Sequence, residues 1–212
     1  MKILSLLPIC VFCTYVHAQT NGHSLVSDST RLKSRVTGEI RHFLRWTDRL
    51  GDNYLILSVT EEKPSAAAIS QQGTSCNGNC SDKELYAYHF IGRDSLLWKL
   101  GDFEKACATN AIAEFRNGAT KITDLDHDGV AEVWVMYSLG CANDARPRTL
   151  KLIMYQGNKK YAIRGTSIPN RILSDEKAIS QYNPDKEFDS LPQAIKDFAR
   201  SLWIKYQTDN PW

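Results

Sequence analysis

Short runs of apolar residues recur along most of the chain, and glycine, asparagine, aspartate and serine separate them. Runs of this length that are rich in β-branched and aromatic residues are typical of β-strands. The turn residues between neighbouring runs, such as Gly92 and Gly157, favour antiparallel hairpins. The pattern predicts strands at residues 40–46, 54–60, 85–90, 95–100, 106–115, 130–139, 150–155 and 161–165.

The last element follows a different period and is predicted to be a helix. Ser190 and Gln193 form a candidate capping box, and Pro192 is tolerated in a first helical turn. The apolar positions that share one helical face are Leu191, Ile195, Phe198, Leu202 and Tyr206. We therefore expect an amphipathic helix at 190–206 that packs against a sheet. The expected fold class is α+β, mostly β, with antiparallel hairpins in a single β-rich domain, 37–212.

Two further features concern the organisation of this domain. Residues 61–83 are rich in small and polar residues and predict a long loop, a kind of segment that is often functional. A weak internal repeat is also visible, because Asp48 to Gly51 and Asp126 to Gly129 each precede a strand and a hairpin. The repeat predicts two blade-like sheets that pack together.

The N-terminus has the pattern of a secretory signal peptide. Lys2 precedes an apolar run at 3–16, and Ala18 is a suitable residue before a cleavage site. The run is too short to span a bilayer, which disfavours an uncleaved anchor. We expect a signal peptide at 1–18, a flexible arm at 19–36, and export to the periplasm, the cell surface or the medium.

Composition restricts the partners. The chain has 26 basic and 24 acidic residues, so its formal net charge is only +2. A balance this even does not predict binding to nucleic acid or to an anionic membrane. No second apolar stretch is long enough to cross a bilayer, so we expect the mature chain to be soluble.

The cysteines support export. Six are present, and two of them belong to the expected signal peptide. The remaining four allow three pairings, and an oxidising compartment favours two disulfides. We favour the pairs Cys76–Cys80, across a short flexible turn, and Cys107–Cys141, between two strands. A four-thiolate zinc site is the alternative, but the last two cysteines each stand alone in the sequence.

The most distinctive chemical feature is an acidic loop with carboxylates at alternate positions. Calcium prefers 6–8 oxygen ligands, which a tight loop can supply from alternate residues. The expected ligands of one calcium ion are the side chains of Asp124, Asp126 and Asp128, the carbonyl of Val130, and Glu132. The ion is expected to brace the fold. Magnesium is disfavoured because it demands stricter octahedral geometry.

This loop has three other interpretations. An EF-hand requires glutamate at its twelfth position, where this chain has Val135 inside a predicted strand. A phosphatase-type pair, Asp124 and Asp126, lacks the rest of that motif. A metal-free turn is the simpler alternative, since turns favour aspartate and glycine. Repulsion among four carboxylates argues against it unless a cation or protons compensate.

Two resemblances extend this interpretation. The acidic loop between strands resembles the calcium loops of integrin-type FG-GAP repeats. The loop with its following strand (124–137), residues 150–164, and the helix start at Leu191-Pro192 together resemble a family of small exported bacterial proteins labelled surface polysaccharide biosynthesis protein. That resemblance implies a link to cell-surface glycans and carries over no catalytic residues.

The sequence contains none of the common catalytic or nucleotide-binding motifs, including the nucleophile elbow, the zinc-protease helix and the phosphate-binding glycine loop. We therefore expect an exported calcium-binding envelope protein without enzymatic activity, whose partner is a surface glycan or an envelope protein. The alternative is a small glycan hydrolase that uses two carboxylates, because their pairing is visible only in three dimensions.

Overall fold

The computed structural model describes residues 31–142, 146–169 and 180–209. The expected signal peptide and residues 19–30 of the expected arm lie outside this part of the chain. None of the helices in the described ranges is long and apolar enough to cross a membrane.

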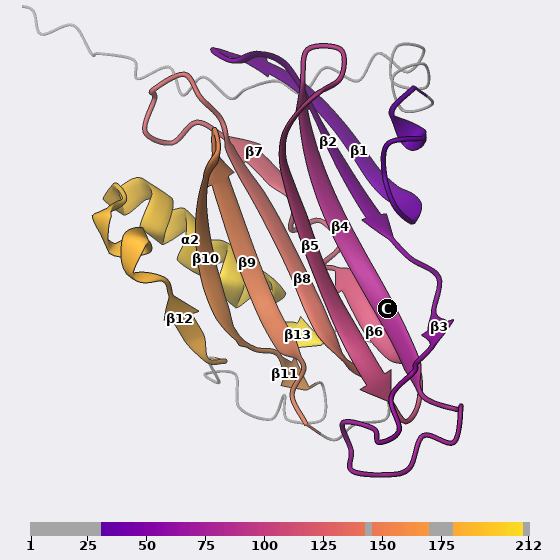
Figure 1. The fold of residues 1–212 in the computed structure, drawn as a ribbon. Coiled ribbons are helices and arrows are strands. Elements are labelled where there is room, and N and C mark those ends of the chain that lie inside the picture. Colours follow the sequence, from indigo (N-terminus) through magenta and orange to yellow (C-terminus); the bar gives the residue numbers. More distant parts are fainter. Residues whose placement is uncertain (1–30, 143–145, 170–179, 210–212) are drawn as a thin grey trace, which may run out of the picture.

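The first sheet is an antiparallel meander of long strands (Figure 1). Its strands are β1 (Glu39–Asp48), β2 (Gly51–Val59), β3 (Lys63–Pro64), β4 (Ser81–Ile91) and β5 (Ser95–Cys107). The order β1-β2-β4-β5 follows the chain, and the short β3 also pairs with β4. The predicted strands at 40–46, 85–90 and 95–100 each lie within one of these longer strands, and the prediction at 54–60 runs one residue past the end of β2.

The second sheet has the order β12-β10-β9-β8-β6, and β7 also pairs with β8. Its strands are β6 (Ala111–Phe115), β7 (Lys121–Thr123), β8 (Glu132–Cys141), β9 (Thr149–Gln156), β10 (Lys159–Thr166) and β12 (Tyr182–Pro184). Two short strands, β11 (Ile168–Pro169) and β13 (Thr208–Asp209), pair in parallel and form a separate two-stranded sheet. Strands β7 to β10 form a second antiparallel meander, so each sheet holds the kind of unit that the weak repeat predicts.

The two sheets pack face to face over the larger apolar core. Alternate residues of β2, β4 and β5 meet alternate residues of β8 and β9, as expected for a sandwich. Trp98 of β5 stacks on Tyr155 of β9 with ring centroids 3.9 Å apart. Aromatic pairs in contact stabilise a core beyond their buried area, by about 0.5–1.5 kcal/mol.

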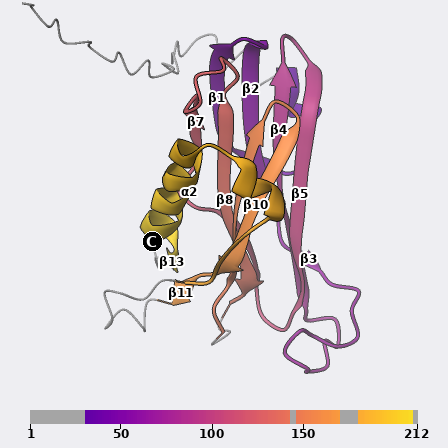
Figure 2. The ribbon, with the colours of Figure 1, turned by 90° about the vertical axis from the view of Figure 1, so that its left-hand side faces the viewer.

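The C-terminal helix, α2 (Gln193–Tyr206), covers the outer face of the second sheet. Figure 2 shows it on the side away from β4 and β5. Its buried residues include Ile195, Leu202 and Trp203, which pack on the outward side chains of β8, β9 and β10. The prediction of a mostly β fold with antiparallel sheets and a C-terminal amphipathic helix is therefore confirmed.

The start of this helix differs from the prediction. Ser190 ends a 3₁₀-helix (Lys186–Ser190), and its hydroxyl donates to the carbonyl of Glu187. The side chain of Gln193 instead donates to Asp197 within the helix. No side-chain cap bond forms at Pro192, so the predicted capping box is wrong and the helix begins at Gln193.

Three other boundaries also differ from the sequence pattern. The predicted strand at 106–115 is two strands, because Ala106 has a φ of 52° and the chain turns between Cys107 and Ala111. The predicted loop at 61–83 contains β3 and the start of β4. Of the predicted arm, residues 31–36 are described, and Leu32 among them is fully buried against the outer face of the first sheet.

Candidate metal centre

The acidic loop connects β7 to β8 at one end of the sandwich. Two residues in it have positive φ, His127 at 57° and Gly129 at 80°. These values lie in the left-handed region, which glycine adopts without strain. The two left-handed residues fold the loop tightly enough for its alternating aspartates to face one another.

The structure brings three of the predicted ligands together. One carboxylate oxygen from each of Asp124, Asp126 and Asp128 lies within 4.8 Å of the other two. Asp128 is exposed, and the other two are half-buried. The side chain of His127 is exposed as well. The cluster therefore offers oxygen atoms as metal ligands, and these suit a hard cation such as calcium or magnesium.

Hydrogen bonds hold most of these carboxylates in place. Asp126 accepts from the amide of Asp128 (3.3 Å) and from the side chain of Gln156 at the end of β9 (2.9 Å). Asp128 accepts from the amide of Val130 (2.7 Å). Asp124 is different, because its Oδ1 atom is buried and accepts no hydrogen bond from the described residues.

A buried carboxylate oxygen without a donor is costly unless a proton or a cation compensates it. The orphaned Oδ1 atom of Asp124 therefore fits the presence of a metal ion. Asp124, Asp126 and Asp128 are the residues that could hold one. The structure adds no observation about the carbonyl of Val130, the fourth predicted ligand.

Glu132, the fifth predicted ligand, is fully buried and lies outside the group of three. It accepts from the hydroxyl of Thr123 (2.7 Å) and from the amide of Leu125 (3.1 and 3.0 Å). Burial raises the pKa of Glu132, and the charges of Asp126 and Asp124 raise it further, whereas these hydrogen bonds lower it. In this structure Glu132 positions the start of the loop.

The loop is also attached to the first sheet, through the turn between β1 and β2. Asp48 accepts from the amide of Ala131 (3.0 Å), and the amide of Arg49 donates to the carbonyl of Gly129 (2.8 Å). The guanidinium of Arg49 lies 4.0 Å from Asp128. Sequence reasoning missed both of these residues, although the weak repeat had already paired their turn with the acidic loop.

Asp48 links the loop to a buried histidine. It accepts from the side chain of Asn53 (2.9 Å), whose oxygen lies 2.9 Å from Nε2 of His89. His89 lies between Trp46 and Trp98, with ring centroids 4.9 and 5.2 Å away. Burial lowers its pKa to about 4, against a smaller opposing effect of the Asp48 charge. His89 is therefore neutral at physiological pH.

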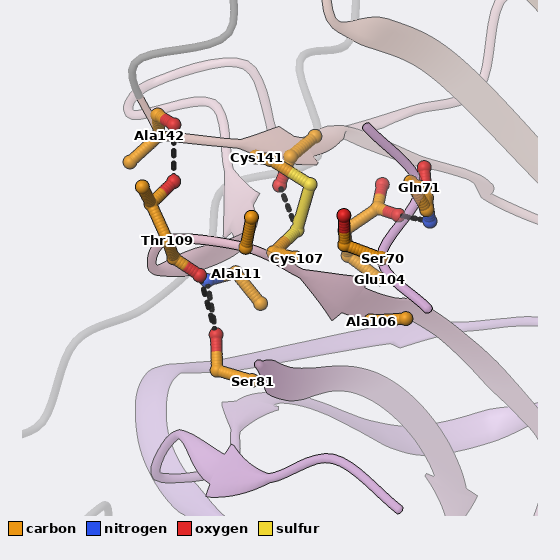
Figure 3. The surroundings of a disulfide bond; sticks show 12 residues. Ser70, Gln71, Ser81, Glu104, Ala106, Cys107, Thr109, Ala111, Cys141 and Ala142 are labelled. Carbon is orange, nitrogen blue, oxygen red and sulfur yellow. Dashed lines mark hydrogen bonds between the residues drawn. A yellow bond between two sulfur atoms is a disulfide. The ribbon is translucent and has the colours of Figure 1, made fainter. Parts of the chain in front are cut away.

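The opposite end of β8 is closed by a disulfide. Cys107 at the end of β5 is bonded to Cys141 at the end of β8, so the bond joins the two sheets (Figure 3). Cys76 is bonded to Cys80 within the long connection before β4. Both pairs are those that the spacing favours.

Glu104 lies beside the inter-sheet disulfide, with a carboxylate oxygen within 4.8 Å of both sulfurs (Figure 3). The side chain of Gln71 donates a hydrogen bond to it. Burial raises the pKa of Glu104. The two sulfurs are consumed by the disulfide, so this group offers no thiolate to a metal ion.

Comparisons with protein-family models, with curated proteins and with solved structures find no match to this chain.

Proposed function

We propose that this chain is an exported calcium-binding envelope protein that acts on no substrate chemically and is linked to a cell-surface polysaccharide. One observation carries the calcium assignment: three carboxylates converge within 4.8 Å, and one of them has a buried oxygen without a donor. Among the described residues, Arg49 is the only cation within ion-pair distance of the three, at 4.0 Å. A bound divalent cation removes the remaining repulsion.

Calcium is favoured over magnesium because it accepts flexible coordination, whereas magnesium demands near-ideal octahedral geometry. Asp126 and Asp128 are each held by hydrogen bonds within the protein, so they are not free to adopt an ideal octahedral arrangement. The ion is proposed as a brace, because the loop contacts the first sheet through Asp48 and the second sheet through Gln156.

Calcium titration by calorimetry tests this assignment. The wild-type chain is expected to bind one calcium ion, with weaker binding of magnesium. Asp124→Asn removes the charge of the orphaned carboxylate and should abolish measurable binding. Asp189→Asn is the matched control, because Asp189 is exposed on the 3₁₀-helix and far along the chain from the loop. Equal binding by both variants would contradict the proposal.

The proposal of export is supported by the signal-type start and by the two disulfides. It predicts that the chain made in a bacterial host is recovered from the periplasm or the medium, and that the mature N-terminus is Gln19. Mass spectrometry of the fractionated protein measures both. Recovery of the full-length, reduced chain from the cytoplasm alone would contradict this part.

The hydrolase alternative gains no specific support. A two-carboxylate glycosidase needs both groups to face one cleft, about 5–10 Å apart. Two of the pockets in the described part of the chain contain a glutamate, Glu104 in one and Glu114 in the other, and neither of these two is lined by a second carboxylate. The link to polysaccharide is therefore proposed as binding.

A further inference from the structure

A pocket of about 410 Å³ lies where the edges of the two sheets meet, and we call it the edge pocket. One wall comes from β1, β2 and β4, and the other comes from β6 and the residues that follow it. The volume falls within the range of small-molecule sites, about 300–1,000 Å³. Arg41, His42 and Asn117 line the pocket and are exposed, so solvent and ligands can reach it.

A β-bulge aims two of these side chains into the pocket. Ile40 pairs with Ser58 and His42 pairs with Leu57, so Arg41 is the extra residue in β1. Leu57 belongs to the core between the sheets, and both bulge residues lie opposite it. Bulges are common next to functional sites, where they redirect side chains. Here the bulge places arginine and histidine on the inner side of an edge strand.

Lys83 brings a second fixed positive charge, beside that of Arg41, to the same inner face. It lies two and four residues before Leu85 and Ala87 on β4, and both of these belong to the core between the sheets. Inner faces of a sandwich are normally apolar. The second sheet contributes the small residue Ala113 to the lining of the same pocket.

The two fixed cations of the pocket, Arg41 and Lys83, have anionic neighbours: Lys83 lies opposite Glu104 in the β4–β5 register, and its charge acts on Glu62. Among the described residues, neither His42 nor Lys83 has an ion-pair partner, whereas Arg41 pairs with the exposed Glu39 at 2.9 Å. The one carboxylate that lines the pocket, that of Glu114, pairs with Arg148 at 2.7 Å. The residues that line the pocket therefore carry two fixed positive charges, on Arg41 and Lys83, against the one negative charge of Glu114, and Lys83 has no partner within ion-pair distance in the described part of the chain.

We propose that the edge pocket binds a uronic acid, the carboxylate-bearing sugar of acidic polysaccharides. Arg41 and Lys83 match the carboxylate, which a guanidinium can hold with two parallel hydrogen bonds. His42 and Asn117 supply hydrogen-bonding groups for hydroxyls. Phe115 and Val59 provide an apolar surface for the C–H face of the sugar ring. The inference rests on the polysaccharide part of the proposed function and does not require the calcium site.

Calorimetric titration with trigalacturonate, in EDTA so that calcium cannot bridge the carboxylates, tests the proposal. Lys83→Gln and Arg41→Gln should each weaken binding about tenfold, and Lys83→Arg should largely restore it. Lys159→Gln is the matched control, since Lys159 is exposed at the β9–β10 turn and should leave the affinity unchanged. Maltotriose, which is neutral, and inorganic phosphate, which is only an anion, should both bind far more weakly.

Each outcome bears on a different part of the argument. Trigalacturonate binding that the pocket variants do not change would overturn the edge pocket and leave the polysaccharide link standing. No binding at all would overturn both. Phosphate that binds as tightly as trigalacturonate would show a simple anion site and overturn the assignment to a sugar. Calcium titration of the same samples reports separately on the acidic loop.

Discussion

Acidification should destabilise this fold through one buried side chain, His89. It is only 2% exposed, and no partner is found for its Nδ1 atom among the described residues. The unfolded chain takes up a proton on this histidine near pH 6.5, whereas burial holds the folded pKa at about 4. Between these values the unfolded state binds more protons, so stability falls as the pH falls.

The magnitude follows from the two pKa values. Each unit of difference between them is worth about 1.4 kcal/mol, so the whole loss, complete below pH 4, is about 3 kcal/mol. Two-thirds of it, about 2 kcal/mol, should already be lost between pH 8 and pH 5. Other groups contribute to the total slope, and the raised pKa values of Glu104 and Glu132 act in the opposite direction.

Two variants separate the contribution of His89 to the pH dependence of stability from that of other groups. His89→Gln keeps a side chain that can donate to Asn53 but cannot titrate, and His127→Gln changes an exposed histidine. The free energy of unfolding is measured in urea at pH 8, 6 and 5. Its loss between pH 8 and pH 5 should be about 2 kcal/mol smaller for His89→Gln than for the wild type. The control should follow the wild type. The reasoning is refuted if His89→Gln loses as much stability as the wild type over this range.

Three further predictions test the joints of the sandwich. Replacing Cys107 and Cys141 by serine opens a loop of 34 residues between the sheets and should cost about 4 kcal/mol in urea unfolding, and a loss below 1 kcal/mol would contradict the role of this bond. Gly165→Ala should cost about 1–3 kcal/mol, because its Cβ would lie 1.8 Å from the backbone just before β12. At Gly140 the nearest atom to an added Cβ is Cγ of Arg148 at 3.0 Å, so Gly140→Ala should cost less, and equal costs in urea unfolding would contradict this prediction. Asp48→Ala removes the acceptor that holds the acidic loop and should weaken calcium binding at least about tenfold in calorimetry, while unchanged affinity would show that the turn does not support the site.

Local patterns were sufficient to predict most of this fold. Alternating apolar residues and glycine turns predicted the strands, because the side-chain period of a strand is visible in a few residues. The short spacing of Cys76 and Cys80 likewise favoured the pairing that the structure shows. The same local logic predicted a capping box at Ser190, and it was wrong because the preceding 3₁₀-helix uses that hydroxyl.

Long-range contacts explain what sequence reasoning missed. Asp48 accepts a hydrogen bond from the amide of Ala131, which lies 83 residues away in the sequence. The edge pocket depends on a bulge in β1 and on a strand in the other sheet. No window of sequence contains both parts of such a contact.

The most direct test of the central claim is thermal unfolding of the oxidised mature chain in calcium and in EDTA, beside the Asp126→Ala variant. At a calcium concentration of 100 times Kd, binding to the folded state alone adds about 2.7 kcal/mol of stability. For a domain of this size that corresponds to a rise in Tm of about 5–10 °C. The account predicts this rise for the wild type and its loss in Asp126→Ala. Identical melting curves for the wild type in calcium and in EDTA would contradict the claim that a calcium ion braces the two sheets.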